Sequence, residues 1–158
     1  MKIERIMVPT DFSEHSRAAL GCALDLAREY GAEVVLIHVV EPLPHGIGRW
    51  SEPTQLLEGH AETASGQLEH FEKEAKQLYP KCRSELHFGV VHEVVGEQVG
   101  KLKVDLIVIS MRGQTHVLDL LIGSTAEKIL RYAPCAVLRI RTPHNGDEAE
   151  RSAGKFET

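Results

Sequence analysis

The stretch from 110 to 127 holds the densest group of residues suited to binding a small anion. Gly113 and Gly123 bracket nine residues, and Ser124 follows at the start of a helical pattern. Glycine lets the backbone approach a ligand closely, and the open amides and dipole of a helix start attract anions, so phosphate is the natural candidate. A second explanation needs no ligand, because Ser124 and Glu127 are spaced as a capping box. Both explanations stay open at this point.

A second candidate group follows the first apolar run, in the segment P-T-D-F-S from Pro9 to Ser13. Asp11 is a good helix cap, and it can cap the following helix alone or together with Ser13. Alternatively, its carboxylate points into a crevice, toward a nucleobase or a metal ion on phosphates. The residue types alone are compatible with either role.

Nine histidines and three cysteines invite a search for a metal or catalytic site. No H-x-x-x-H, H-E-x-x-H or C-x-x-C spacing occurs, and these are the spacings that metal and redox sites use most often. We therefore expect no metal ligands, no catalytic residues, and reduced, buried thiols. His38 lies inside an apolar run, and we expect it to be a packed, hydrogen-bonded core residue.

Length and charge limit the class of protein. A chain of 158 residues suits one domain with its own core. The 18 Lys and Arg against 23 Asp and Glu give a formal charge of −5, which argues against general binding of nucleic acid or anionic lipid. No apolar run approaches the roughly 18 residues of a membrane span, and the first residues do not resemble a signal peptide. We expect a cytoplasmic protein without membrane association.

Short apolar runs alternate with segments of helical period, which is typical of a parallel α/β sheet. The five runs are Ile3 to Val8, Glu33 to Val40, Glu85 to Val90, Val104 to Ser110 and Cys135 to Ile140. The second and fourth are almost continuously apolar, as expected for central strands with helices on both faces. The pattern predicts an open five-stranded parallel sheet, doubly wound and Rossmann-like.

Four helices are predicted between and after these strands. Their apolar stripes cover residues 19–30, 57–78, 94–102 and 126–133, and Gly31, Pro80 and Pro134 end three of them. In such a fold, ligands bind beyond the carboxyl ends of the strands, which is where both candidate groups lie. Residues 142–158 are polar, so we expect residues 1–141 to form the domain and 142–158 a flexible tail.

Several motifs together resemble the universal stress protein family. They are V-P-T-D-F-S at 8–13, L-I-H-V at 36–39, and the closing string G-S-T-A-E with A-P-C-A-V-L between 123 and 138. The likeness runs from about Lys2 to Arg141. The bracketed glycines look like the pattern G-x-x-G-x(9)-G-[ST] of the family's ATP-binding subfamily.

The resemblance implies a strand order of 3-2-1-4-5 and a homodimer formed through the last strand, Ala136 to Arg141. It also implies binding of an adenine nucleotide, ATP with or without Mg²⁺, by a stress-response regulatory module that is not an enzyme and that can have a further protein partner. Two alternatives are a slow ATPase and a family member without nucleotide affinity that acts through protein contacts. The chain has no Walker motif, which disfavours the ATPase.

The resemblance also assigns site residues, although one position departs from the pattern. Ser110 stands where the first motif glycine is expected, and its side chain hinders close approach of a ligand without preventing it. The implied site consists of Gly113, Gly123, Ser124 and Thr125 around phosphates and ribose, Arg112 near phosphate charge, Pro9, Thr10 and Asp11 on the base side, the Val39 backbone at adenine, and Gly89 leaving room nearby.

Overall fold

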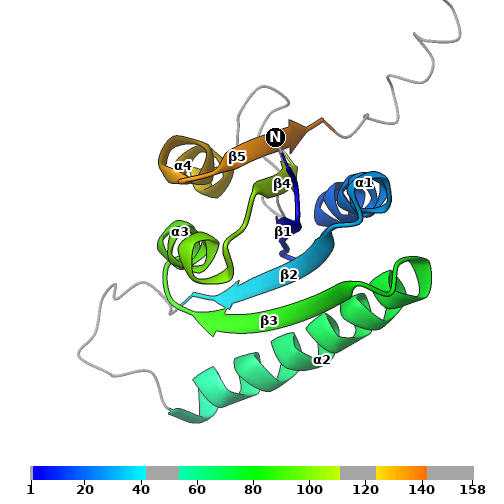
Figure 1. Ribbon diagram of the computed structural model, residues 1–158. Coiled ribbons are helices and arrows are strands. Elements are labelled where there is room, and N and C mark those ends of the chain that lie inside the picture. Colours follow the sequence, from blue (N-terminus) through cyan, green and yellow to red (C-terminus); the bar gives the residue numbers. More distant parts are fainter. Residues whose placement is uncertain (1, 42–53, 111–123, 142–158) are drawn as a thin grey trace, which may run out of the picture.

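The computed structural model describes residues 2–41, 54–110 and 124–141, with side-chain placement omitted at 54–58 (Figure 1). The strands are β1 (Arg5–Pro9), β2 (Glu33–Val40), β3 (Cys82–Phe88), β4 (Leu106–Ser110) and β5 (Ala136–Ile140). All four pairings are parallel and the order is β3-β2-β1-β4-β5. The predicted fold and strand order are confirmed.

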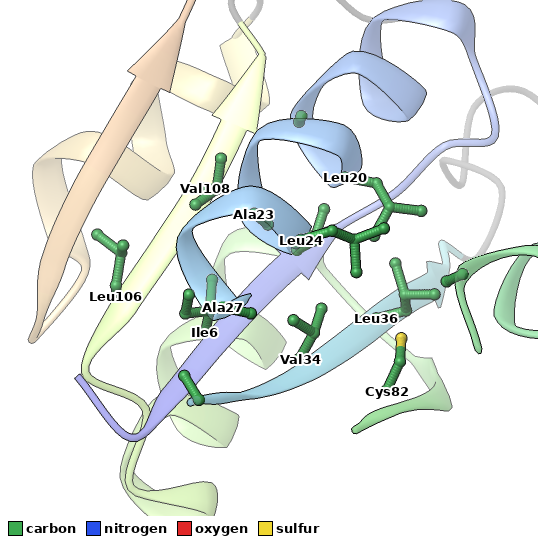
Figure 2. Close-up of a cluster of buried hydrophobic side chains, with 14 of the residues drawn as sticks. Ile6, Leu20, Ala23, Leu24, Ala27, Val34, Leu36, Cys82, Leu106 and Val108 are labelled. Carbon is green, nitrogen blue, oxygen red and sulfur yellow. The ribbon is translucent and has the colours of Figure 1, made fainter. Parts of the chain in front are cut away.

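Two helices cover each face of the sheet. The helices α1 (Glu14–Tyr30) and α2 (Thr54–Leu78) lie on one face, and α3 (Val91–Leu102) and α4 (Ser124–Tyr132) lie on the other (Figure 1). Successive strand residues alternate between the two cores. Ile6 and Val8 of β1 join the first core with Leu24 of α1, and Met7 joins the second with Val95 of α3. Figure 2 shows side chains of the first core gathered between α1 and the sheet.

The predicted central strands are interior, and the third strand was misplaced. β2 and β4 each have a neighbour on both sides, which explains their continuous apolar runs. β3 begins at Cys82 and ends at Phe88, so its predicted range of 85–90 is wrong. The reason is that β3 is an edge strand, where Arg83 and Ser84 take strand positions that an apolar run does not reveal.

A charge cluster ties three strands together at their amino ends. The Glu33 carboxylate on β2 accepts hydrogen bonds from Arg5 Nε on β1 at 2.6 Å and from Arg83 Nε on β3 at 2.8 Å. Burial acts to raise the pKa of Glu33, but the two guanidinium groups outweigh burial and hold the pKa of that carboxyl below its usual value. The charged tie therefore lies at the end of the sheet away from the candidate site.

Helix α2 is longer than the strand it covers. Its 25 residues span about 37 Å, whereas the seven residues of β3 span about 23 Å. Because α2 ends close to the start of β3, its first turns extend past the carboxyl ends of the strands (Figure 1). The α2 turns near residue 60 therefore stand beside the edge where a ligand is expected. No described helix is long and apolar enough to cross a bilayer.

Candidate functional site

The turn after β1 is held by hydroxyl groups. The amide of Thr10 makes a backbone hydrogen bond to Ile37 O at 2.9 Å. Its buried hydroxyl accepts from the amide of Phe12 at 3.0 Å and donates to Ser16 Oγ, also at 3.0 Å. Thr10, a predicted site residue, thus fixes the path of the chain between the strand and α1.

Ser13, not Asp11, caps α1. Ser13 Oγ accepts from the amide of Ser16 at 3.2 Å, and Asp11 Oδ1 accepts from both the amide and the hydroxyl of Ser13, at 3.0 and 2.5 Å. Asp11 therefore orients the cap and also lines a hollow beside the strand ends. The two roles that the sequence left open are compatible.

Phe12 takes an unusual backbone conformation. Its φ is 65°, in the left-handed region that bulky residues seldom occupy and that costs about 1–3 kcal/mol. This conformation places the ring 4.4 Å from the His38 ring and 6.1 Å from Phe71, edge on. His38 Nδ1 lies 2.8 Å from the carbonyl oxygen of Thr10. Ring contacts and hydrogen bonds thus offset the strain and join the turn to β2 and α2.

Strand β2 continues past the end of β1, and Val39 lies in this last part of β2. Ile37 O accepts from Thr10 on the β1 side, and Val40 O accepts from Gly89 at 3.1 Å on the β3 side. Since successive peptide groups in a strand face opposite neighbours, the N–H and C=O of Val39 face the β1 side. The β1–β2 ladder ends at Pro9 and Ile37. The peptide groups of Val39 therefore lie past the last pair of that ladder.

A hollow of about 400 Å³ opens beside these strand ends, a size that suits a nucleoside. Residues after β1, the end of β2 and the α2 wall enclose it: Asp11, Phe12, His38, Val39, Val40, Glu41, His60, Thr63, Ala64 and Gln67. A larger hollow of about 690 Å³ lies at the opposite end, lined by residues from Lys2 to Glu4 and by Tyr30 and Gly31. We favour the smaller one, because parallel sheets bind ligands at carboxyl ends.

Gly89 is required by the backbone. Its φ is +133°, and a Cβ there would lie 3.1 Å from Val94 Cγ2. Its amide hydrogen bond to Val40 places the turn after β3 next to the end of β2. The glycine is therefore explained without a ligand, whether or not it also leaves room for one.

The remaining predicted residues concern β4 and α4. Ser110 is partly buried at the end of β4, beside Ile140 of β5. Ser124 and Thr125 are exposed in the first described turn of α4. Glu127 contacts Arg131 at 3.4 Å. Arg112, Gly113 and Gly123 lie outside the described residues, as does the predicted tail.

The family follows from comparison with known proteins. The universal stress protein family model matches residues 2–141. A universal stress protein of Methanocaldococcus jannaschii is 34% identical over 144 residues, which cover 89% of this chain and 83% of the relative. The chain belongs to the universal stress protein family.

Two solved universal stress proteins share the fold of this family member. One, in complex with cAMP, has a TM-score of 0.69 at 19% identity and covers 90% of this chain and 100% of its own. The other, from Archaeoglobus fulgidus in complex with dAMP, has a TM-score of 0.62 at 21% identity and covers 89% of this chain and 99% of its own. At these identities the likeness concerns the fold.

The sequence of this universal stress protein did not indicate that residues of α2 line the hollow. His60, Thr63 and Gln67 are exposed around the buried Ala64, and in the sequence they read as the solvated side of a helix. The apolar pattern predicted for this helix, residues 57–78, is longer than any predicted strand. That length could have indicated that the helix extends past the strand ends. His38 makes the expected hydrogen bond but is only partly buried. Within the described ranges, no group of three or more His, Cys, Asp or Glu could hold a metal ion.

We expect Gly89→Ala to lower the free energy of unfolding by about 1–3 kcal/mol, because alanine is strained at this φ. The matched control is Gly96→Ala inside α3, where an added Cβ meets nothing within 4 Å and should gain about 0.5–1 kcal/mol. Urea unfolding of both variants gives the comparison. Equal stability changes at the two positions would contradict a backbone requirement at Gly89.

Proposed function

We propose that this universal stress protein binds ATP at the carboxyl ends of β2, β1 and β4 and acts as a cytoplasmic regulatory module. The observation that carries the proposal is the hollow beside Asp11, next to the Val39 peptide groups past the end of the β1–β2 ladder. A backbone donor and acceptor past the end of the ladder, at a hollow of nucleoside size, suit the edge of a purine base.

Strand order supports a direction for the bound nucleotide. β2, β1 and β4 are neighbours in that order, with adjacent strands about 4.8 Å apart. Val39 ends the first, Asp11 follows the second, and Ser124 begins the helix after the third. Base, ribose and phosphates then follow one another along the edge. The Asp11 carboxylate lies at the ribose and can accept hydrogen bonds from the ribose hydroxyl groups.

The start of α4 suits the phosphates. The side chains of Ser124 and Thr125 are exposed there, and the first amides of a helix carry partial positive charge. The hollow is the poorer place for an anion, since the carboxylates of Asp11 and Glu41 both line it. Charge therefore favours phosphates toward α4 and the uncharged nucleoside toward α2, with Mg²⁺ as an optional companion of the phosphates.

The solved relatives add support from outside the chain. The cAMP and dAMP complexes are universal stress proteins that hold adenine nucleotides on this fold. Binding without turnover is the simpler proposal, because the sequence has no Walker motif. The protein would then signal through its occupied and empty forms to a partner protein.

Isothermal titration with ATP tests the proposal. We expect the wild-type chain to bind ATP, and Ser124→Glu to weaken binding by at least about tenfold, since a carboxylate at the start of α4 repels the phosphates. Gln77→Glu adds the same charge to an exposed position of α2 and should bind normally. Analysis of the ATP mixture for ADP separates binding from slow hydrolysis.

Failure of the wild-type chain to bind ATP, with or without Mg²⁺, would overturn the proposal in favour of a family member that acts through protein contacts. Equal weakening by both charge variants would locate the phosphates elsewhere.

The edge strand β5 supports a homodimer. Within the described part of the chain, β5 pairs with β4 alone, and Leu138 is 36% exposed on it. An edge strand with exposed apolar side chains can pair with a second copy, which satisfies backbone groups on both. The segment from Ala136 to Arg141 is thus proposed as the dimer contact.

Leu138→Glu should convert the dimer to a monomer, because a charge would be buried at the contact. Leu78→Glu is the control, since Leu78 is also exposed, at 63%, but lies on α2 away from β5. Light scattering after gel filtration measures both masses. A monomeric wild-type protein, or a dimer that survives Leu138→Glu, would contradict this contact.

A further inference from the structure

His38 has one ring nitrogen committed to the fold. Its Nδ1 lies 2.8 Å from the carbonyl oxygen of Thr10, and a carbonyl oxygen can only accept a hydrogen bond. Nδ1 therefore carries the proton, and in the neutral ring Nε2 is an acceptor with a lone pair. Within the described ranges, Nε2 has no hydrogen-bond partner.

The ring of His38 is held in one orientation. The Phe12 ring lies 4.4 Å away at an interplanar angle of 32°, and Phe12 is itself held edge-on against the buried Phe71. Together with the hydrogen bond to Thr10, these contacts restrict rotation about both side-chain bonds. His38 lines the hollow, so it presents a fixed polar ring to any ligand there.

Several of the other polar groups around the hollow offer acceptors, while Gln67 and His60 can both donate and accept. Thr63 donates its hydroxyl proton to Gly59 O at 2.9 Å, which leaves oxygen lone pairs. Glu41 accepts from the Val91 amide at 3.1 Å and has a second carboxylate oxygen. With Nε2 of His38, the hollow is rich in acceptors. A ligand that brings hydrogen-bond donors is complementary to it.

We infer that His38 determines specificity for the base, with Nε2 accepting a hydrogen bond from an exocyclic amino group of a purine. This rests on the proposed nucleotide binding and deepens it. His38 lies on β2, one strand beyond Asp11, so it is placed at the base when Asp11 meets the ribose. Adenine carries an amino donor at C6, whereas hypoxanthine carries an oxygen acceptor there, and that acceptor would face the Nε2 lone pair.

The test compares the affinities for ATP and ITP in two variants of the full chain. His38→Asn keeps an N–H at the Nδ1 position for Thr10 and removes the Nε2 acceptor. His38→Gln can place an oxygen near the Nε2 position and loses the bond to Thr10. Titration calorimetry gives the four affinities and those of the wild type, and thermal unfolding reports the fold of each variant.

We expect the wild-type chain to prefer ATP over ITP by about tenfold, the worth of one hydrogen bond made or opposed. His38→Asn should bring the ratio within about twofold, mainly by weakening ATP, whereas His38→Gln should keep part of the preference. A fully retained preference in a folded His38→Asn protein would overturn the role of His38 and leave nucleotide binding intact. If the wild-type chain binds neither nucleotide, both proposals fail.

A second measurement needs no substitution. Nitrogen-15 spectra of the imidazole should show the Nε2 signal of His38 moving upfield when ATP saturates the protein, because its lone pair then accepts a hydrogen bond. ITP should leave that signal in place. An Nε2 signal unchanged by saturating ATP would overturn the inference even if His38→Asn fails to fold.

Discussion

The turn between β1 and α1 depends on Phe12 holding a φ of 65°, a conformation that a bulky side chain seldom adopts. Reversing the chain there sends the ring back over His38 and Phe71 and leaves Asp11 beside the strand ends. Hydrogen bonds of the Thr10 hydroxyl, to Ser16 Oγ and from the Phe12 amide, hold the same turn. One strained residue therefore sets the position of the carboxylate, the orientation of the histidine and the start of α1.

The rest of the edge is arranged by topology. A strand order of β3-β2-β1-β4-β5 places three strand ends next to one another where the winding direction changes. The Glu33 contacts with Arg5 and Arg83 lie at the opposite end of the sheet, and the polar groups that face the hollow lie at the carboxyl ends. The long α2 closes its outer side. The proposed function thus needs a rigid sheet, a strained turn and one overlong helix.

Much of the fold is readable from the sequence, since interior strands must be apolar on both faces and β2 and β4 meet that condition. Gly31 ends α1 at a φ of 69°, as its residue type predicted. The edge strand β3 was harder to predict, because Arg83 and Ser84 are compatible with a strand covered on one face only and give no apolar pattern.

The sequence indicated which segments form the site but not which residues are in contact. It could not show that Ser13 is the cap and that Asp11 holds it, or that His60 and Gln67 line the hollow. The placement of His60 and Gln67 depends on tertiary packing, since His60 lies 22 residues along the chain from His38, which lines the same hollow.

The most direct measurement is an amide chemical-shift map of the isotopically labelled protein with increasing ATP. We expect the amides of Asp11, Val39 and Thr125 to shift together and saturate at one affinity, while Gly31 and Lys81 at the amino ends of the strands stay in place. Shifts centred on Gly31, in the larger hollow at the opposite end, or no shifts at all, would contradict a nucleotide site at the carboxyl ends of β2, β1 and β4.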